Sequence, residues 1–426
     1  MTEIENFASA SALETRPLFT ARETCRLCGG KGLEILLDLG EQCVGNDFHP
    51  PGAPPSPKAP LALALCPSCG LVQLAHSVDK DFLYARYWYR SGVNRTMRNH
   101  LKDLLDSALG FRPVREGEAV IDIGCNDGTL LEGYPRGVRR IGVDPSNIRP
   151  AACDVFVNDY YSFENVREAL QGRKAGIITS IAMFYDLDDP REFAREVRRA
   201  LADDGVWVLE LSYLPLMLSQ VSYDTICHEH VTYYRLETFE KVLEGTDLEA
   251  ADVEFNGCNG GSFRLYVVPK GSRRPTRRLQ AAREEERGGG YGERGPYETF
   301  REKVELSRAR LMEFLSSVQA HGETVYGYGA STKGMVTLQY CRVTPAQVQA
   351  VAERNPEKVG MLTPGTEIPI CSEEEMRAAR PDYLLVLPWH FLPEFLEREK
   401  EYLVGGGKMV VPLPEFKVFS WEDGRR

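Results

Sequence analysis

Residues 119–131, AVIDIGCNDGTLL, decide the fold of the central part of this 426-residue chain. They read as an apolar strand, a tight turn that contains Gly124 and Gly128, and the start of a helix. The turn lacks the GxGxxG spacing of dinucleotide-binding loops. The next apolar run, RRIGVD, ends in Asp144, whose carboxylate can accept both ribose hydroxyls of an adenosine. These features predict an adenosine cofactor on a doubly wound α/β sheet.

Strand-like and helix-like segments alternate on both sides of this stretch, from about residue 80 to 270. Residues 176–182 and 205–211 read as strands, and residues 191–204 read as a helix. Such alternation is typical of βαβ units and a mostly parallel sheet. The charged, glycine-rich stretch at 271–298 predicts an exposed linker. Residues 297–322 then predict one long amphipathic helix, followed by a second α/β region.

Four cysteines occur as two matched knuckles, CRLCGG at 25–30 and CPSCG at 66–70. Two such pairs can supply four thiolates in a tetrahedron, as a structural zinc ion requires. A redox CxxC needs only one pair near a βαβ unit, and neither pair has that context. The sequence therefore predicts a closed structural zinc site with the ligands Cys25, Cys28, Cys66 and Cys69.

Composition limits the class of protein. Hydrophobic residues make up 43% of the chain, and the formal net charge is −11. This charge disfavours nucleic-acid binding, which depends on clustered positive charge. The chain contains no run of about 18 apolar residues, the length that a membrane-spanning helix needs. Residues 1–22 lack the apolar core of a signal peptide. With eleven cysteines, the chain is expected in a reducing compartment, the cytoplasm.

The loop IGCNDG (123–128) and the strand end GVDPS (142–146) resemble the S-adenosylmethionine (SAM) signature of class I methyltransferases. The resemblance implies that Asp144 holds the ribose of SAM and that the end of the fourth strand, from Met183, lies over the adenine side. It also implies that four loop residues line the methionine end of SAM, namely Gly124, Asn126, Asp127 and Gly128.

Two of the seven histidines, His228 and His230, lie in the stretch DTICHEHVTYY at 224–234. HEH lacks the HExxH spacing that puts two zinc ligands on one helical face, which disfavours a zinc hydrolase. His230 could serve as a general base, because imidazole titrates near neutral pH. Glu229 could orient it or bind a sugar hydroxyl. The alternative is a hydrogen-bonded, partly buried histidine pair.

A second glycine-bearing turn, VYGYGASTKG at 325–334, joins a predicted strand to a predicted helix. It is not a P-loop, because GxxxxGK[ST] is absent. The N–H groups at the helix start, together with Ser331, Thr332 and Lys333, can still form a cradle for a phosphate. Such a cradle suits a nucleotide diphosphate that is held and not cleaved.

The knuckles, the SAM loop, DTICHEHVTYY and GYGASTKG together resemble the sugar C-methyltransferases of deoxysugar pathways. The resemblance covers nearly the whole chain, from about residue 24 to 416. It implies a zinc domain, a SAM domain and a C-terminal α/β domain that holds a nucleotide-sugar. In that family a Tyr-His-Glu-His run lines the active site, and its last histidine is the favoured base. Here His228, Glu229 and His230 match, whereas Cys227 stands in place of the tyrosine.

Further side chains are candidates for substrate contact. Tyr84 and Tyr89 precede the SAM domain and could form an aromatic wall, or only pack between two domains. His390 ends a later strand, the usual place for ligand contacts in an open α/β sheet. Ser262 and Arg264 follow a glycine turn. His390, Ser262 and Arg264 could each equally belong to a turn or a core.

We therefore expect an α/β protein with a zinc-binding domain (1–80), a class I SAM-methyltransferase domain with a doubly wound sheet (81–270), a linker and long helix (271–320), and a Rossmann-like nucleotide-sugar domain (321–426). The expected reaction transfers a methyl group from SAM to a carbon beside the ketone of a nucleotide-linked keto-deoxysugar, through an enolate. Two alternatives remain: an O- or N-methyltransferase acting on another small metabolite, and an inactive zinc-containing binding protein. We expect a monomer or small homo-oligomer without nucleic-acid or membrane partners.

Overall fold

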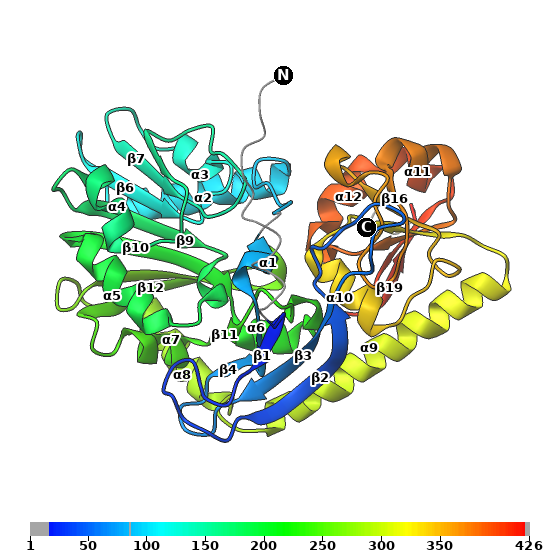
Figure 1. Ribbon diagram of the computed structural model, residues 1–426, viewed down its shortest axis with the longest axis horizontal. Helices are drawn as coiled ribbons and strands as arrows, with labels where there is room; N and C mark the ends of the chain where they lie inside the picture. The colour runs from blue at the N-terminus through cyan, green and yellow to red at the C-terminus, as the bar shows by residue number, and fades with distance from the viewer. Residues whose placement is uncertain (1–16, 85–86, 422–426) are drawn as a thin grey trace.

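The computed structural model describes residues 17–84 and 87–421. The outer ends of the two predicted terminal domains, 1–16 and 422–426, lie outside the described residues. Two α/β bodies lie side by side; the N-terminal strands lie below and between them, and the long helix α9 (Gly295–Ala320) runs from there beneath the C-terminal body (Figure 1). This architecture confirms the predicted fold class, and α9 confirms the predicted long helix.

The central body contains a seven-stranded sheet in the order β12-β13-β10-β9-β6-β7-β8. Its strands are β6 (Ala119–Ile123), β7 (Arg139–Val143), β8 (Val155–Val157), β9 (Ala175–Ile181), β10 (Leu201–Ser212), β12 (Leu248–Asn256) and β13 (Ser262–Pro269). Strand β6 pairs in parallel with β7 on one side and β9 on the other, so the strand order reverses at β6. Ligands of open α/β sheets bind outside the carboxyl ends at such a reversal.

Alternating side chains of the central strands enter two different cores. Val120 packs with α2 (Arg95–Phe111) and α3 (Thr129–Glu132) on one face. Ile121 packs on the other face with α4 (Phe163–Leu170), α5 and α7. Helices α5 (Pro190–Ala200) and α7 (Leu236–Leu243) contact each other there. A sheet buried on both faces explains the continuous apolar runs of these strands.

Two details of the sequence-based prediction are wrong. The predicted helix at 191–204 ends at Ala200, because Leu201 already pairs with Ala175 in the sheet. The predicted linker contains the helix α8 (Arg277–Gly288). Thr276 caps this helix by accepting a hydrogen bond from the N–H of Leu279, and Leu279, Ala282 and Glu286 bury one face. Because only two of these buried positions are apolar and the segment is highly charged, its sequence shows little of the hydrophobic periodicity that would predict a helix.

The C-terminal body has a six-stranded sheet in the order β16-β15-β14-β17-β18-β19. Its strands are β14 (Val325–Tyr328), β15 (Ala350–Glu353), β16 (Ile370–Ser372), β17 (Tyr383–Val386), β18 (Lys408–Val411) and β19 (Lys417–Phe419). Only β19 runs antiparallel to its neighbour. The order reverses at β14, which leads into α10 (Thr332–Tyr340). This sheet therefore has its own reversal point beside the second glycine turn.

The N-terminal strands form a sheet that recruits a strand from the central body. Its order is β11-β4-β3-β2, with β2 (Glu34–Cys43), β3 (Lys58–Leu65), β4 (Val72–Leu74) and β11 (Thr232–Tyr233). Strands β1 (Phe19–Ala21) and β5 (His76–Val78) form a separate pair. Because β11 directly follows the HEH run, pairing of β11 with β4 fixes that run against the N-terminal domain.

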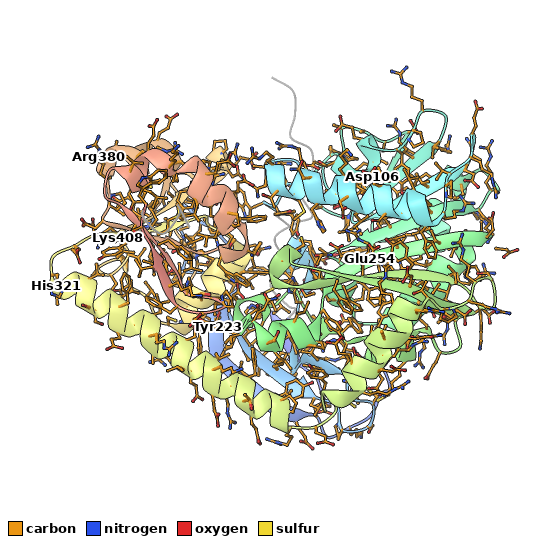
Figure 2. The ribbon with its side chains drawn as sticks, turned by 180° about the vertical axis from the view of Figure 1, so that it is seen from behind. Asp106, Tyr223, Glu254, His321, Arg380 and Lys408 are labelled. Carbon is orange, nitrogen blue, oxygen red and sulfur yellow. The ribbon has the colours of Figure 1, made fainter. Side chains whose placement is uncertain are left out.

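The DTICHEH segment also contacts the C-terminal body. It begins with the short helix η3 (Tyr223–Thr225), which lies against α10. Tyr223 is fully buried, and its ring lies 5.5 Å from that of Tyr340. Figure 2 places Tyr223 between the two α/β bodies. Among the described residues, no helix is both long and apolar enough to cross a membrane.

Candidate active site

The four knuckle cysteines converge as predicted. All four Sγ atoms lie within 4.8 Å of one another. The Cys25–Cys69 and Cys28–Cys66 Sγ distances are 3.5 and 3.6 Å, close to the edge of about 3.8 Å expected for a tetrahedron with Zn–S bonds of about 2.3 Å. The hydrogen bond from Cys69 lowers the pKa of the Cys25 thiol to about 5. The donor set fits a closed structural zinc site.

Backbone N–H groups support the thiolates. The N–H of Leu27 donates to Cys25 Sγ and that of Gly30 to Cys28 Sγ, each at 3.4 Å. Gly29, after the second cysteine, has a φ of +70°, which an L side chain rarely adopts. Such N–H donors favour the charged thiolate, so the turn geometry suits metal binding without an open coordination position.

The SAM loop and the end of β7 are joined through Asp144. Its two carboxylate oxygens accept hydrogen bonds from the N–H groups of Asn126 (2.8 Å) and Ser146 (2.9 Å). Each oxygen keeps a free lone pair. Gly124 and Gly128 have φ angles of +75° and +83°, and the side chain of Met183 packs against Gly124. The predicted cofactor residues therefore meet at the reversal point of the sheet.

Asn126 and Asp127 hold the segment that follows Tyr84 against the SAM loop. Asn126 accepts a hydrogen bond from the N–H of Ser91 (3.0 Å) and donates to the carbonyl of Tyr89 (3.0 Å). Asp127 accepts one from the N–H of Gly92 (2.7 Å). The side chain of Tyr89 is 41% exposed. The structure thus brings the predicted aromatic segment to the cofactor loop through its backbone.

His230 lies at the carboxyl end of the central sheet with one ring nitrogen engaged. Its Nδ1 lies 2.8 Å from the carbonyl oxygen of Thr225, so Nδ1 carries the proton and donates it. Its ring centroid lies 4.1 Å from that of Tyr185. Burial, with a smaller contribution from the charge of Lys333, lowers the pKa of His230 to about 3. Nε2 is therefore an unprotonated acceptor, as a general base requires.

Two acidic side chains near His230 have an oxygen without a protein partner. Burial raises the pKa of both Glu229 and Asp186. Within the described residues, Glu229 Oε2 and Asp186 Oδ1 are buried and accept no hydrogen bond. The hydroxyl of Tyr84 donates to Asp186 Oδ2 at 2.9 Å. Buried polar atoms without partners are rare in proteins and often mark places where a ligand binds.

His228 points to a different partner. Its Nε2 lies 3.2 Å from the carbonyl oxygen of Ala59 on β3, and the residue is 2% exposed. Burial lowers the pKa of His228 to about 4. Its contact fastens the HEH run to the N-terminal sheet, so this ring nitrogen is already engaged by a protein group.

Four of the predicted substrate residues belong to the C-terminal domain and lie near its junction with the central body, where the DTICHEH segment packs. Ser331 Oγ accepts a hydrogen bond from the N–H of Gly334 at 3.1 Å and so caps α10. Lys333 Nζ donates to the carbonyl of Asn259 in the central body at 2.8 Å. Burial, more than the charge of Lys333, lowers the pKa of His390 to about 3. Thr332 packs against Gly45 of the N-terminal domain.

Arg264 and Ser262 lie in the interior of the central body. The Arg264 guanidinium, on a residue that is 2% exposed, forms ion pairs with Glu210 (2.9 Å), Glu254 (3.1 Å) and Asp103 (3.2 Å). Ser262 Oγ donates to the carbonyl of Cys258 at 3.0 Å. These contacts are with protein groups, so the structure gives no sign that either side chain faces a substrate.

Glu210 also closes a cluster with His100 and Cys258 whose ligand atoms lie within 4.8 Å. His100 Nε2 is hydrogen-bonded to Glu210 Oε1. The other oxygen of Glu210 accepts from Arg264 and from Asn256, each at 2.9 Å. With both oxygens engaged and a guanidinium alongside, the cluster is an internal hydrogen-bond network and a poor cation site.

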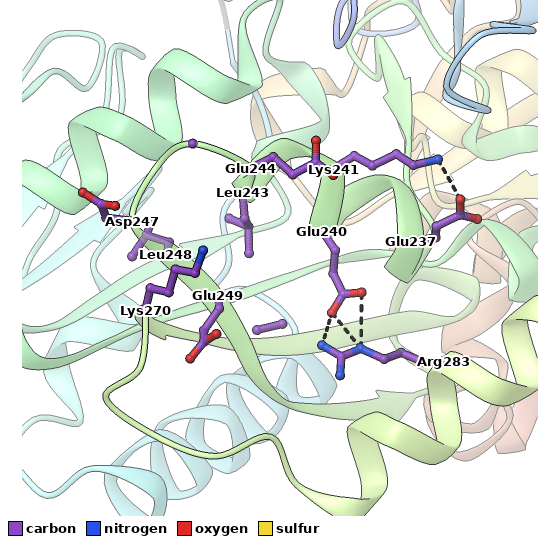
Figure 3. Close-up of a pocket in the computed structure, with 12 residues that line it drawn as sticks. Glu237, Glu240, Lys241, Leu243, Glu244, Asp247, Leu248, Glu249, Lys270 and Arg283 are labelled. Atoms are coloured by element: carbon purple, nitrogen blue, oxygen red, sulfur yellow. Dashed lines mark hydrogen bonds and ion pairs between the residues drawn. The ribbon is translucent and has the colours of Figure 1, made fainter.

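A surface pocket of about 430 Å³ lies between α7, β12 and α8 (Figure 3). Its labelled side chains include both acids and bases, and Glu240 and Arg283 form an ion pair across it. None of the predicted catalytic, cofactor or substrate residues lines this pocket. The junction around His230, and not this pocket, is therefore the candidate active site.

Sequence reasoning missed two contributors to this junction. Trp389 Nε1 donates to Asp224 Oδ2 at 2.9 Å and thereby ties the C-terminal domain to the DTICHEH segment. Tyr185 lies against His230. From the sequence, Tyr185 could be placed at the end of a predicted strand and Trp389 beside His390, but the residues that they contact could not be inferred. Their partners are far away along the chain, and no local pattern reveals such pairs.

Three family models match consecutive parts of the chain. Residues 25–84 match a model described as "Putative zinc binding domain", 93–253 a methyltransferase domain, and 257–414 a C-methyltransferase C-terminal domain. The C-methyltransferase NovU of Streptomyces niveus is 31% identical over 409 residues, which cover 94% of this chain and 97% of NovU. The chain belongs to this C-methyltransferase family. The chain is a SAM-dependent C-methyltransferase with a zinc-binding N-terminal domain.

Solved structures align with part of the chain at low identity. A SAM-dependent methyltransferase from Clostridium acetobutylicum is 16% identical with a TM-score of 0.32, and the match covers 42% of this chain and 94% of that one. The magnesium protoporphyrin IX methyltransferase of Synechocystis is 12% identical with a TM-score of 0.31 and coverages of 43% and 87%. The family assignment favours carbon as the methylated atom over an O- or N-methyltransferase and over an inactive binding protein.

Replacing Cys66 by Ser should abolish stoichiometric zinc binding and lower the melting temperature, because three thiolates no longer complete the tetrahedron. Metal content by mass spectrometry and thermal unfolding measure the two effects. Cys43→Ser is the matched control, since Cys43 is also buried and its thiol donates to the carbonyl of Ser56 and not to a knuckle cysteine. Full zinc content in the Cys66 variant would contradict the assigned ligand set.

Replacing Arg264 by Met should lower the free energy of unfolding by about 3–5 kcal/mol, because it leaves the buried carboxylate of Glu210 without its guanidinium partner. Chemical denaturation measures this change. Arg274→Met, at an exposed position nearby in sequence, should change stability little. If the Arg264 variant were as stable as the wild type and lost only substrate affinity, Arg264 would be a substrate ligand after all.

Proposed function

We propose that this C-methyltransferase acts on a carbon beside the ketone of a nucleotide-linked keto-deoxysugar. The observation that carries the proposal is the neutral imidazole of His230. Its ring packs on Tyr185, which follows β9 of the central sheet, and the charge of Lys333 at the start of α10 contributes to its lowered pKa; its Nδ1 faces the Thr225 carbonyl, so Nε2 is unprotonated. A reaction at oxygen or nitrogen starts from a nucleophile, whereas a reaction at carbon beside a ketone first needs a base.

The cofactor residues are proposed from their convergence on one edge of the sheet. Asp144 would accept the ribose hydroxyls with its remaining lone pairs, and Gly124 and Gly128 would let the backbone approach the methionine portion. Asn126 and Asp127 would shape this seat by holding residues 89–92 in place. Met183, packed on Gly124, would border the adenine. SAM supplies an electrophilic methyl group when bound there.

The diphosphate seat is proposed at the start of α10. Within the described residues, the backbone N–H groups of Thr332 and Lys333 have no hydrogen-bond partner, as expected for the first turn of a helix. Two such donors, the positive end of the helix dipole and the Thr332 hydroxyl suit a phosphate. Ser331 supports the seat by capping the helix, and His390 would border the sugar.

The chain's own groups would then carry the proton. His230 Nε2 removes the proton from the carbon beside the ketone, and the Thr225 carbonyl holds the ring in place and stabilises the imidazolium. Glu229 and Asp186 would accept hydrogen bonds from sugar hydroxyls through their unpartnered oxygens. His228 keeps the run in register with β3. The cytoplasmic location and the oligomeric state proposed from sequence remain predictions.

Replacing His230 by Asn should lower kcat by about 10²–10⁴-fold, the usual contribution of a positioned base. SAM affinity, measured by calorimetry, should stay within a few-fold. In D₂O the variant should also stop exchanging the proton beside the ketone, which NMR of the substrate reports. His321→Asn, on the exposed end of α9, is the control. Normal turnover or normal exchange in the His230 variant would exclude it as the base.

The pH profile offers an independent check. Burial depresses the pKa of His230 to about 3, so the base form persists as pH falls through the usual histidine range. kcat/KM should therefore show no loss on the acid side near pH 6.5, and any decline should begin well below it. Circular dichroism at each pH separates activity loss from unfolding. An acid limb with an apparent pKa near 6.5 that depends on His230 would contradict a buried, neutral base.

A further inference from the structure

We propose that Lys333 is a catalytic residue that stabilises the negative charge of the enolate oxygen, and that it does not serve as the phosphate ligand. The inference rests on the proposed function, because it needs a ketone at the junction. Removing the proton requires a base, which His230 supplies, and a group that stabilises the charge that develops on the ketone oxygen. The site described above contains no such group, and the inference assigns this role to Lys333.

The position of the ammonium supports this role. Lys333 is the second residue of α10, yet its Nζ does not stay over the helix start. It crosses to the central body and donates to the carbonyl of Asn259 in the short helix η4 (Cys258–Gly260) at 2.8 Å. One of the three N–H groups of the ammonium is thereby fixed, and two stay available. This contact between the two bodies holds the cation where its charge acts on both His230 and His390.

The ammonium also lacks a fixed counter-ion. Across residues 17–84 and 87–421, no carboxylate oxygen lies within 4.0 Å of Lys333 Nζ. Asp224 is near enough for the charge of Lys333 to oppose the rise in pKa that burial causes, but no ion pair joins the two side chains: Oδ2 accepts from Trp389, and Oδ1 has no partner among the described residues. A half-buried cation with no counter-ion loses solvation without compensation. An anion that forms only during the reaction would compensate for this lost solvation.

The charge of Lys333 reaches the base. It contributes to the lowered pKa of both His230 and His390. After proton transfer the His230 imidazolium and the Lys333 ammonium are two cations at one site, which is unfavourable unless negative charge lies between them. The enolate oxygen provides that charge. Fixed donors aimed at a developing oxyanion are often the largest contribution to catalysis.

The step balances without further reactants. His230 Nε2 takes the proton, the C–H electron pair becomes the C=C bond, and the C=O electron pair moves onto the oxygen beside Lys333. The C=O bond re-forms when the enolate carbon bonds to the methyl group of SAM, and S-adenosylhomocysteine leaves. The proton stays on His230 until solvent removes it. Lys333 neither gains nor loses a proton.

The test separates enolate stabilisation from phosphate binding. The probes are dTDP- and UDP-linked 4-keto-6-deoxyhexoses, and dTDP and UDP without a sugar. In Lys333→Gln, which can keep the bond to Asn259 and loses the charge, exchange of the proton beside the ketone in D₂O without SAM should fall about 10²–10³-fold, as for loss of one oxyanion donor. Affinity for the matching nucleoside diphosphate, measured by calorimetry, should stay within threefold.

Two further variants complete the test. Lys333→Arg keeps a cation and should retain at least a tenth of the wild-type exchange rate. Lys303→Gln, an exposed lysine on α9, should behave as the wild type. If circular dichroism shows that the Gln variant is unfolded, Lys333→Met is measured in its place.

Each other outcome overturns the idea in a distinct way. Normal proton exchange in Lys333→Gln with nucleoside diphosphate affinity reduced tenfold or more would assign the residue to the phosphate. Normal values of both would remove it from the site. If the wild type exchanges and methylates no probe of the panel, the proposed keto-sugar function falls, and this inference falls with it.

Discussion

The placement of the HEH run depends on one sheet interaction, the pairing of β11 with β4. Thr232 lies opposite Gln73 and Tyr233 opposite Val72, and β4 begins directly after the second zinc knuckle. His228, four residues before Thr232, adds a side-chain hydrogen bond to the carbonyl of Ala59 on β3. A closed zinc site does no chemistry. By holding the edge onto which β11 pairs, it nevertheless determines where His230 stands.

Charge within the junction follows from burial. The two imidazoles and the carboxyl groups of Glu229, Asp186 and Asp224 are all shifted toward their neutral forms by desolvation. A neutral imidazole is a competent base, and protonated carboxyls can donate as well as accept hydrogen bonds. In this buried site, where the effective dielectric is low, the ammonium of Lys333 contributes to the pKa values of His230, His390 and Asp224.

The features that the sequence could predict were those whose contributing residues lie close together along the chain. The SAM loop and the zinc knuckles were predictable because turn, glycine and ligand lie within a few residues, and both formed as expected. His228 and His230 are two residues apart and of one type, yet they face Ala59 and Thr225 respectively. For Arg264 the sequence left a substrate contact and a place in a turn or core equally open, and the structure pairs it with Glu210, Glu254 and Asp103. Ala59 lies 169 residues from His228, and Glu210 lies 54 residues from Arg264, so no local pattern could identify these partners. The partner of His230 is only five residues away, but it is a backbone carbonyl, which no residue type reveals.

The two α/β bodies each have a reversal point at the carboxyl edge of their sheet, one at β6 and one at β14. A methyl transfer needs donor and acceptor in line at about 3–3.5 Å, a spacing that neither sheet can set alone. Direct ties cross the junction, from Trp389 to Asp224 and from Lys333 to Asn259, and the N-terminal sheet joins both bodies from below (Figure 1). The distance between the two half-sites is therefore a property of the three domains together. This explains why a chain with a complete methyltransferase sheet also carries a zinc domain with no chemistry of its own.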